Sequence, residues 1–317
     1  MFIINRRIPS LPPKFAFLLT AVMVFVAYLM DDGVFLLPAF APLAYGAVTG
    51  TGCWACGRNV FVAVLGLSAA AGVAAVRIGG VVHPWGCMLA VCLVVSGLLG
   101  LSRSRLFPAY AVALLPVYLG EGRITYVLVV LAMALLLVCL CHFPRNGRPL
   151  PEVVGRGRVL PLVMPVVTMG PLFFLSDLFA NAYFLTPALW YVCAELFGSG
   201  ASGTTFSRLT QLLFAVLLGA SADKAAMSLL QFSGLADAGV VPAVVYAVSL
   251  LLALLLFCRL AGRRLFLPAL VFVVFPFLRD GETAYVLAAD FSFLYMLLVV
   301  YIFNRLWGKS AQNNLDA

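Results

Sequence analysis

Two acidic side chains lie inside long apolar stretches of this sequence. Glu195 falls in the segment 183–199, and Asp290 falls in the segment 284–303. An ionisable group at membrane depth usually faces the interior of a helical bundle or a water-filled cavity. Either carboxylate could therefore bind a cation or carry protons. The alternatives are that Glu195 lies near the cytoplasmic interface and that Asp290 pairs with a basic residue near the outer face.

Two arginines, Arg58 and Arg208, open apolar segments that occupy matching places in the two halves of the chain. The planar donors of a guanidinium can hold an oxyanion, and a helix N-terminus adds free N–H groups and a favourable dipole. Together the two arginines could form an entrance for an anion. The alternative, which we favour, is that they are basic anchors on the cytoplasmic side.

Several prolines interrupt the apolar segments in both halves. A proline inside a helix removes a donor and frees the carbonyl four residues earlier. Freed carbonyls at mid-depth can bind ions, and broken helices often mark transporter sites. Proline is also common in membrane helices generally, so kinking without a binding role is an equal alternative. The prolines in question are Pro38, Pro108, Pro116, Pro187, Pro268 and Pro276.

No pattern typical of an active site is present. The chain has 2 histidines, and no Ser/His/Asp set, HExxH or Walker pattern appears. Cys53-Trp54-Ala55-Cys56 has the spacing of a redox or metal-binding pair, but no second pair or histidine nearby completes four zinc ligands. We therefore expect no enzyme activity, no catalytic residues, no metal and no cofactor.

The composition requires a lipid environment. Of the 317 residues, 64% are apolar and 10% are charged, and the mean hydropathy is +1.10. A soluble domain carries about 25% charged residues. In lipid the backbone must satisfy its own hydrogen bonds, which leaves helices or a closed barrel. Continuous apolar runs such as 126–141 lack the alternation of barrel strands. We expect an all-α, polytopic transmembrane helical bundle.

About twelve apolar segments follow one another along the chain. Several are shorter than the roughly 20 residues that a full span needs. Those that start at Phe35, Leu106, Tyr183 and Leu265 contain prolines and could be broken or re-entrant. The twelve expected segments are 15–30, 35–50, 59–78, 84–101, 106–119, 125–143, 159–175, 183–199, 209–222, 239–257, 265–278 and 284–303.

The basic residues predict an orientation. With twelve spans and a cytoplasmic N-terminus, 16 of the 20 lysines and arginines fall on the cytoplasmic side and 4 on the other. This is the sense of the positive-inside rule. We expect an integral membrane protein of a bacterial cytoplasmic membrane with both termini in the cytoplasm. Because the basic residues are gathered in the loops expected on the cytoplasmic side, the net charge of +8 does not indicate nucleic-acid binding.

The two halves repeat the same landmarks in the same order. If each unit has six spans, both units insert in the same direction, which predicts a pseudo-two-fold axis along the membrane normal. We expect a first membrane repeat over 1–146, a cytoplasmic linker over 147–158 and a second repeat over 159–317. Gly46 is the counterpart of Glu195 in the first half. The landmarks are 35–39 with 184–188, 105–109 with 264–269, and 120–128 with 279–287.

The segment 106–117 (LFPAYAVALLPV) resembles the signature of the HPP family of membrane proteins, a His-Pro-Pro-Ala-Gly-Ala run that leads into Ala-Leu-Leu-Pro-Val. Arg58-Asn59-Val60, followed by small residues to Gly66, is similar to the family's Pro-Arg-Asn-Val stretch. Leu106 and Phe107 replace the signature His and first Pro. The likeness covers roughly residues 30–146 and, more weakly, 180–305, so the chain resembles a tandem of two such units. Some plant members are associated with nitrite transport across the chloroplast envelope.

These features favour a secondary transporter or permease for a small solute, with an anion as one candidate class. One alternative is a non-transporting membrane scaffold or assembly protein. Another is an aromatic-acid-type exporter, which a looser likeness to fusaric-acid-resistance and aromatic-acid exporters suggests. The expected partners are the lipid bilayer and a small-molecule or ion substrate. We expect no nucleic-acid partner, and the sequence leaves open whether the chain forms a homo-oligomer.

Overall fold

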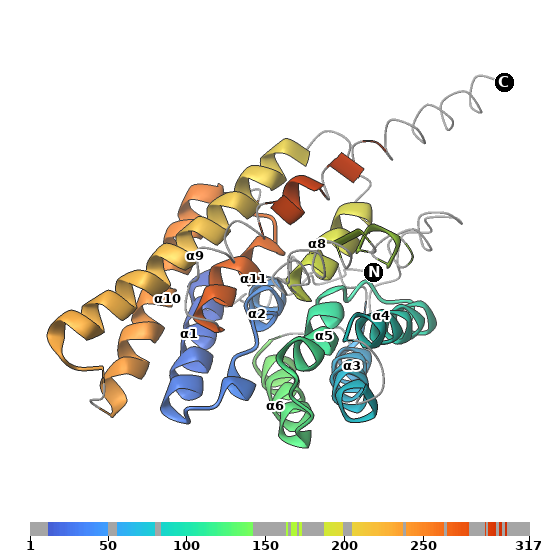
Figure 1. Cartoon of the computed structure of the whole chain (residues 1–317), viewed down its shortest axis with the longest axis horizontal. Helices are drawn as coiled ribbons and strands as arrows, with labels where there is room; N and C mark the ends of the chain where they lie inside the picture. Colours follow the sequence, from blue (N-terminus) through green and yellow to red (C-terminus); the bar gives the residue numbers. More distant parts are fainter. Residues whose placement is uncertain are drawn as a thin grey trace, which may run out of the picture.

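Every regular element that the structure, a computed structural model, describes is helical (Figure 1). The described residues are 12–49, 56–79, 84–141, 163, 166–169, 171–172, 187–198, 205–236, 239–262, 265–278, 289, 291–295, 298–299 and 302. The elements within them are α1 (Pro13–Leu29), η1 (Gly33–Phe35), α2 (Phe40–Thr49), α3 (Arg58–Ile78), α4 (Pro84–Leu101), α5 (Pro108–Leu119), α6 (Ile124–Leu140), α8 (Pro187–Gly198), α9 (Thr205–Ser233), α10 (Val240–Ala261), α11 (Ala269–Val274) and η5 (Phe275–Leu278).

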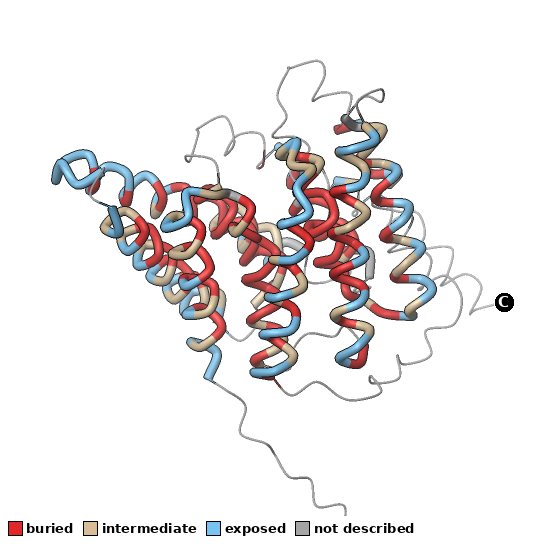
Figure 2. Tube along the Cα trace, turned by 90° about the horizontal axis from the view of Figure 1, so that it is seen from below, coloured by how far each residue is buried: buried red, intermediate tan, exposed pale blue. Residues whose placement is uncertain are grey.

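Three of the described helices are long and apolar enough to cross a membrane. They are α3, the stretch Ser207–Ser233 of α9, and α10. At about 1.5 Å per residue, α3 with 21 residues and α10 with 22 match a hydrocarbon core of roughly 30 Å. Their outward faces carry exposed leucines and valines such as Leu67, Leu217 and Leu252. Figure 2 shows the buried residues facing the centre of the bundle and the exposed ones facing outward.

Four short helices fill the centre of the bundle. α2 has 10 residues, α5 and α8 have 12 each, and α11 has 6 before the chain tightens into η5. At about 1.5 Å per residue none of them reaches across a bilayer alone. Every residue from Ala269 to Val274 is buried. The expectation that the proline-containing segments are broken therefore matches the helix lengths in the described residues.

The long helices surround this centre in two groups (Figure 1). In one group, α3 packs against α4, α5 and α6. In the other, α10 packs against α9 and α1, and α9 also packs against α11. The short helices join the groups, because α5 contacts α8 and α2 contacts α11. α1 thus packs against α10 of the second half of the sequence as well as against α2 of the first half.

Two glycines allow the closest helix crossings. A methyl group on Gly72 would collide with the carbonyl oxygen of Ala113, and one on Gly219 would lie 2.6 Å from the carbonyl oxygen of Val273. Gly72 is the fifteenth residue of α3, and Gly219 is the fifteenth residue of α9. The two carbonyls lie five residues after Pro108 and Pro268, respectively. Each crossing therefore brings the fifteenth residue of a helix against a carbonyl that lies five residues after a proline.

One predicted boundary is wrong in the structure. The segment expected over 209–222 is part of α9, which continues through Asp223 and Lys224 to Ser233. Asp223 is buried, with 2% of its surface exposed, and both charged residues have interaction partners. A charged pair within a helix interrupts the hydropathy pattern without ending the helix, because the backbone hydrogen bonds are unaffected.

Candidate functional site

Glu195 lies close enough to two arginines to interact electrostatically with them. It lies near the C-terminal end of α8, a partly buried position. Arg208 on α9 and Arg105, just before α5, both interact electrostatically with it. The two arginines are partly buried as well. The cluster thus joins three segments that are distant in the sequence, and it contains one negative and two positive charges.

The Arg208 side chain is held by the loop before α11. Its guanidinium lies 5.3 Å from the centre of the Phe266 ring, within the range of a cation–π interaction. The Phe266 backbone N–H donates to Oε1 of Gln211 at 2.7 Å. Because Gln211 and Arg208 are both on α9, this bond fixes the loop against the helix that carries the arginine. Phe266 and Gln211 were not anticipated from the sequence, since neither residue type stands out in an apolar segment.

Arg58 does not belong to this cluster. It is the first residue of α3, whereas Arg208 is the fourth residue of α9. Each arginine thus lies in the first turn of its helix, but the two differ by three positions, close to one helical turn. Arg58 is exposed and lines a surface groove between α3 and α6. Asp290, the other predicted acid, lies outside the described residues.

The recurring prolines have two different roles. Pro108 is the first residue of α5, and Pro268 is the N-cap of α11. At these positions the missing N–H costs no helix hydrogen bond. Pro116 lies inside α5, and Pro276 lies in the tight turn of η5. Only these later two interrupt a helical segment.

Pro116 leaves the Val112 carbonyl without its helical donor. The hydroxyl of Tyr126 on α6 donates to this carbonyl oxygen at 2.6 Å. Tyr126 is almost completely buried. The carbonyl that the proline frees is therefore satisfied within the protein. The signal for this pairing was present in the sequence, since Tyr126 and Tyr285 follow the two later prolines at nearly the same distance.

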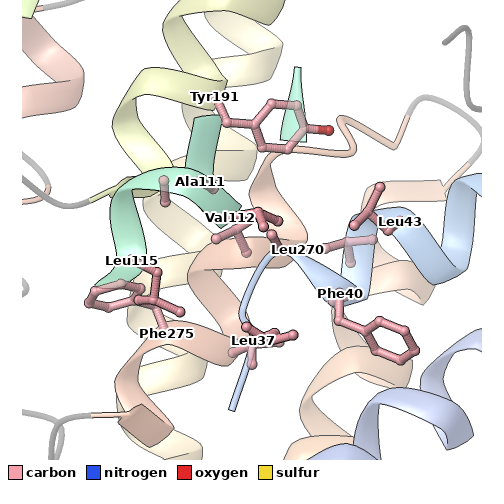
Figure 3. Packing of buried hydrophobic residues seen from close by; sticks show 14 of the residues in the cluster. Leu37, Phe40, Leu43, Ala111, Val112, Leu115, Tyr191, Leu270 and Phe275 are labelled. Atoms are coloured by element: carbon pink, nitrogen blue, oxygen red, sulfur yellow. The ribbon is translucent and has the colours of Figure 1, made fainter. Parts of the chain in front are cut away.

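A second buried polar contact lies between α4 and α5. The hydroxyls of Ser96 and Tyr110 are 2.7 Å apart. Cys92 of α4 and Cys193 of α8 lie close enough to Tyr110 to interact with it electrostatically. Figure 3 shows that the neighbouring core is apolar, with Tyr191 of α8 packed beside residues of α5 and α11. The interior of the bundle is thus apolar with a few hydroxyl and thiol groups.

The opposite end of α5 has a second polar region. Arg123 donates to both carboxylate oxygens of Asp32, at 3.0 and 3.1 Å, and its Nε donates to Glu121 at 2.9 Å. Beside it is a pocket of about 190 Å³ lined by Ala27, Tyr28, Asp31, Asp32, Leu36, Phe277 and Leu278. Arg105 precedes α5 and Glu121 follows it, so the two polar regions lie at opposite ends of this helix.

The described core contains one small apolar cavity between α2, α3, α5 and α6. The cavity there has a volume of about 10 Å³, and its lining is apolar: Leu37, Phe40, Leu43, Leu65, Val112, Val130, Met133, Ala134 and Leu137. Within the described part of the chain, no three His, Cys, Asp or Glu side chains are gathered closely enough to hold a metal ion.

Comparison with known proteins adds no assignment. No protein-family model matches the chain, and neither a curated protein nor a solved structure matches it. The likeness of 106–117 to the HPP signature therefore stays a prediction from the sequence.

Proposed function

We propose that this chain is a secondary transporter or permease for a small anion, built from two six-segment units that insert in the same direction. The observation that carries the proposal is the cluster of Glu195, Arg105 and Arg208 at one end of short, buried helices. Discontinuous helices whose ends point at the solute or the coupling ion are typical of binding sites in secondary transporters. The chain's apolar surface provides the lipid contact.

Matching contacts support the two-unit arrangement. Pairs α3–α4, α3–α5 and α4–α5 correspond to α9–α10, α9–α11 and α10–α11, and each of these pairs is in contact. Between the units, α5–α8 corresponds to α2–α11, and both pairs are again in contact. The crossings at Gly72 and Gly219 occur in the same register. A duplicated unit explains all of these matches at once.

The ends of the helices support a parallel arrangement. The hydroxyl of Tyr28, near the end of α1, donates to the Phe277 carbonyl at 2.9 Å. Asp32, also at this end, pairs with Arg123, which follows α5. The C-terminal ends of α5 and of its counterpart η5 therefore lie on one side of the bundle. Inverted units would put these two ends on opposite sides.

The charges in the cluster suggest how an anion and a proton could be coupled. Arg208 and Arg105 supply guanidinium donors suited to an oxyanion. When Glu195 is ionised, it competes with the anion for these donors. A proton taken up by Glu195 removes this competitor and favours anion binding. In this scheme the proton and the anion bind together.

The expected orientation puts this cluster at the cytoplasmic side and the Asp32–Arg123 region at the other. The prediction rests on the basic loops, which the positive-inside rule holds in the cytoplasm. The bilayer of a bacterial cytoplasmic membrane is the proposed location.

The test uses the purified full chain in sealed proteoliposomes. Uptake of nitrite, nitrate, formate and acetate is measured with an inward proton gradient and without one. We expect uptake of at least one anion that the gradient accelerates. Glu195→Gln should remove the acceleration, and Arg208→Gln should lower uptake by about tenfold or more, as expected for losing a charged partner. Arg259→Gln, at an exposed site on α10, is the matched control. No uptake of any anion, or equal uptake by all variants, contradicts the proposal.

A further inference from the structure

A long groove runs down the outer surface between α3 and α6, away from the Glu195 cluster. Its volume is about 810 Å³, and it is lined by Arg58, Asn59, Val62, Ala63, Gly66, Leu67, Ala70, Val127, Leu131, Leu135 and Val138. All the polar side chains in this lining, Arg58 and Asn59, are at one end. The remaining lining is apolar.

The two helices that form the groove run antiparallel. Arg77, near the end of α3, donates through Nε to the Gly122 carbonyl, just before α6, at 2.7 Å. The start of α3 therefore lies beside the end of α6. A methyl group on Gly66 would lie 2.6 Å from a methyl carbon of Leu131, so the helices are close at the middle of the groove. The lining of the groove extends from Arg58 to Ala70 on α3 and from Val127 to Val138 on α6.

The depth of the groove matches one leaflet. From Arg58 to Ala70 the helix rises about 18 Å, at about 1.5 Å per residue. Half of a hydrocarbon core of roughly 30 Å is about 15 Å. Leu67 and Leu135 are 53% and 51% exposed. An apolar channel of this depth fits an acyl chain that lies along the protein within one leaflet.

The polar end of the groove is suited to a phosphate. Arg58 is exposed, as is Asn59, and neither α3 nor the preceding Gly57 supplies a side-chain cap for the first N–H groups of the helix. A guanidinium, an amide and uncapped helix N–H groups together form a strong anion-binding set. No ion pair with an acidic residue of the described segments neutralises Arg58.

We propose that this groove binds one anionic phospholipid, with the phosphate on Arg58, Asn59 and the first N–H groups of α3 and an acyl chain between α3 and α6. This assignment is independent of the proposed transport. It gives Arg58 a role in lipid binding, whereas Arg208, at the start of the equivalent helix, faces Glu195. The combination of charge at one end and an apolar channel one leaflet deep selects a lipid over a free anion or a protein partner.

Native mass spectrometry of the detergent-solubilised full chain tests the proposal. The probes are dioleoyl phosphatidylglycerol, dioleoyl phosphatidylcholine and inorganic phosphate. We expect the first phosphatidylglycerol to bind more tightly than phosphatidylcholine, and millimolar phosphate to leave this binding unchanged. Arg58→Gln should weaken phosphatidylglycerol binding roughly tenfold, as for a lost charge-assisted contact, with little effect on phosphatidylcholine. Ala63→Trp, which fills the channel, should weaken both lipids.

Two control variants complete the design. Arg259→Gln removes an exposed arginine elsewhere, and Leu128→Trp adds bulk to an exposed position of α6 outside the groove. Both should bind lipid like the parent chain. Equal effects of Arg58→Gln and Arg259→Gln would overturn the proposal. Competition by phosphate would show a free-anion site and would also overturn the proposal. If Leu67→Cys instead formed a cross-linked dimer and no lipid bound, the groove would be an interface between two copies of the chain, and the proposal would be wrong.

Discussion

The hydroxyl of Tyr126 donates to the carbonyl oxygen of Val112, which Pro116 leaves without a helical partner. Because both groups are buried, the loss of the hydroxyl would leave a carbonyl unsatisfied in an apolar interior.

Tyr126→Phe should therefore destabilise the protein by about 1–3 kcal/mol. The measurement is the midpoint of thermal unfolding in detergent. Pro116→Ala restores an N–H that can bond to Val112, so Tyr126→Phe should cost less in a Pro116→Ala background. A cost that does not depend on the residue at 116 would argue against this explanation. If the two halves are equivalent, Tyr285→Phe should also be destabilising, and Pro276→Ala should reduce its effect.

The glycine crossings give a second prediction. Gly72→Ala and Gly219→Ala each place a methyl group against a backbone carbonyl, and a helix backbone cannot move away without repacking. We expect each to lower stability by about 1–3 kcal/mol, as overpacking does. Gly97→Ala is the control, since its methyl group would meet nothing within 4 Å, and it should be neutral or slightly stabilising. Similar melting temperatures for all three variants would show that the crossings are loose.

The Arg123 ion pairs should make a small, salt-dependent contribution. The hydrogen bond to Glu121, followed by the charges of Glu121 and Asp32, raises the pKa of Arg123 above its usual value. Stability from a raised pKa is lost only as pH rises through that value, far above neutral. Arg123→Gln should therefore have the same small effect at about pH 7 and about pH 9, and high salt should remove most of it, because exposed pairs are screened. A clear change of the effect between these pH values would contradict this cause.

Cysteine accessibility checks whether the units are parallel. In a chain whose native cysteines are replaced, Glu121→Cys and Ser233→Cys should react with a membrane-impermeant maleimide from one side of sealed vesicles. Arg103→Cys and Arg259→Cys should react from the other side. Glu121 follows α5 and Ser233 ends α9, whereas Arg103 follows α4 and Arg259 lies in the last turn of α10. Labelling of Ser233→Cys from the same side as Arg103→Cys, and of Arg259→Cys from the same side as Glu121→Cys, would show that the units are inverted.

A proton dependence of transport is expected to require Glu195. In the proposed scheme, anion uptake rises as the external pH falls, because protonation removes a competitor for the arginines. Glu195→Gln should be active at high pH and insensitive to pH, and Glu195→Asp should keep part of the dependence. Initial uptake rates over a range of pH measure this. A steep pH dependence in the glutamine variant would assign the proton to another group.

Hydropathy predicts much of this fold because lipid contact imposes long apolar runs. The segment expected over 84–101 coincides with α4, and that expected over 59–78 differs from α3 by one residue. The extension of α9 past Asp223 was missed, because a charged residue inside a helix lowers the local hydropathy just as the polar residues of a loop do. The packing of α1 against α10 has no signal in a single sequence, because it depends on contacts between distant segments.

The candidate site was predicted only in part. Glu195 and Arg208 stand out in the sequence as charges at the edge of apolar segments, but nothing there indicates that they interact. Arg105 is one of the 16 basic residues that the sequence predicts on the cytoplasmic side, and its position beside Glu195 depends on how α5 packs against α8. Arg58 and Arg208 have different environments although each lies in the first turn of its helix, and a comparison of the two segments by hydropathy does not reveal this difference.

In the proposed two-unit arrangement, the counterpart of the carboxylate at 195 is a glycine, Gly46 on α2. A dimer of identical single units would carry every side chain twice, so one acidic group could not be present without its duplicate. Fusing two copies in one polypeptide lets each copy mutate alone. In the proposed arrangement, one proton could then be coupled to each transport cycle, because only one half of the molecule carries the acidic group and the other half supports it structurally.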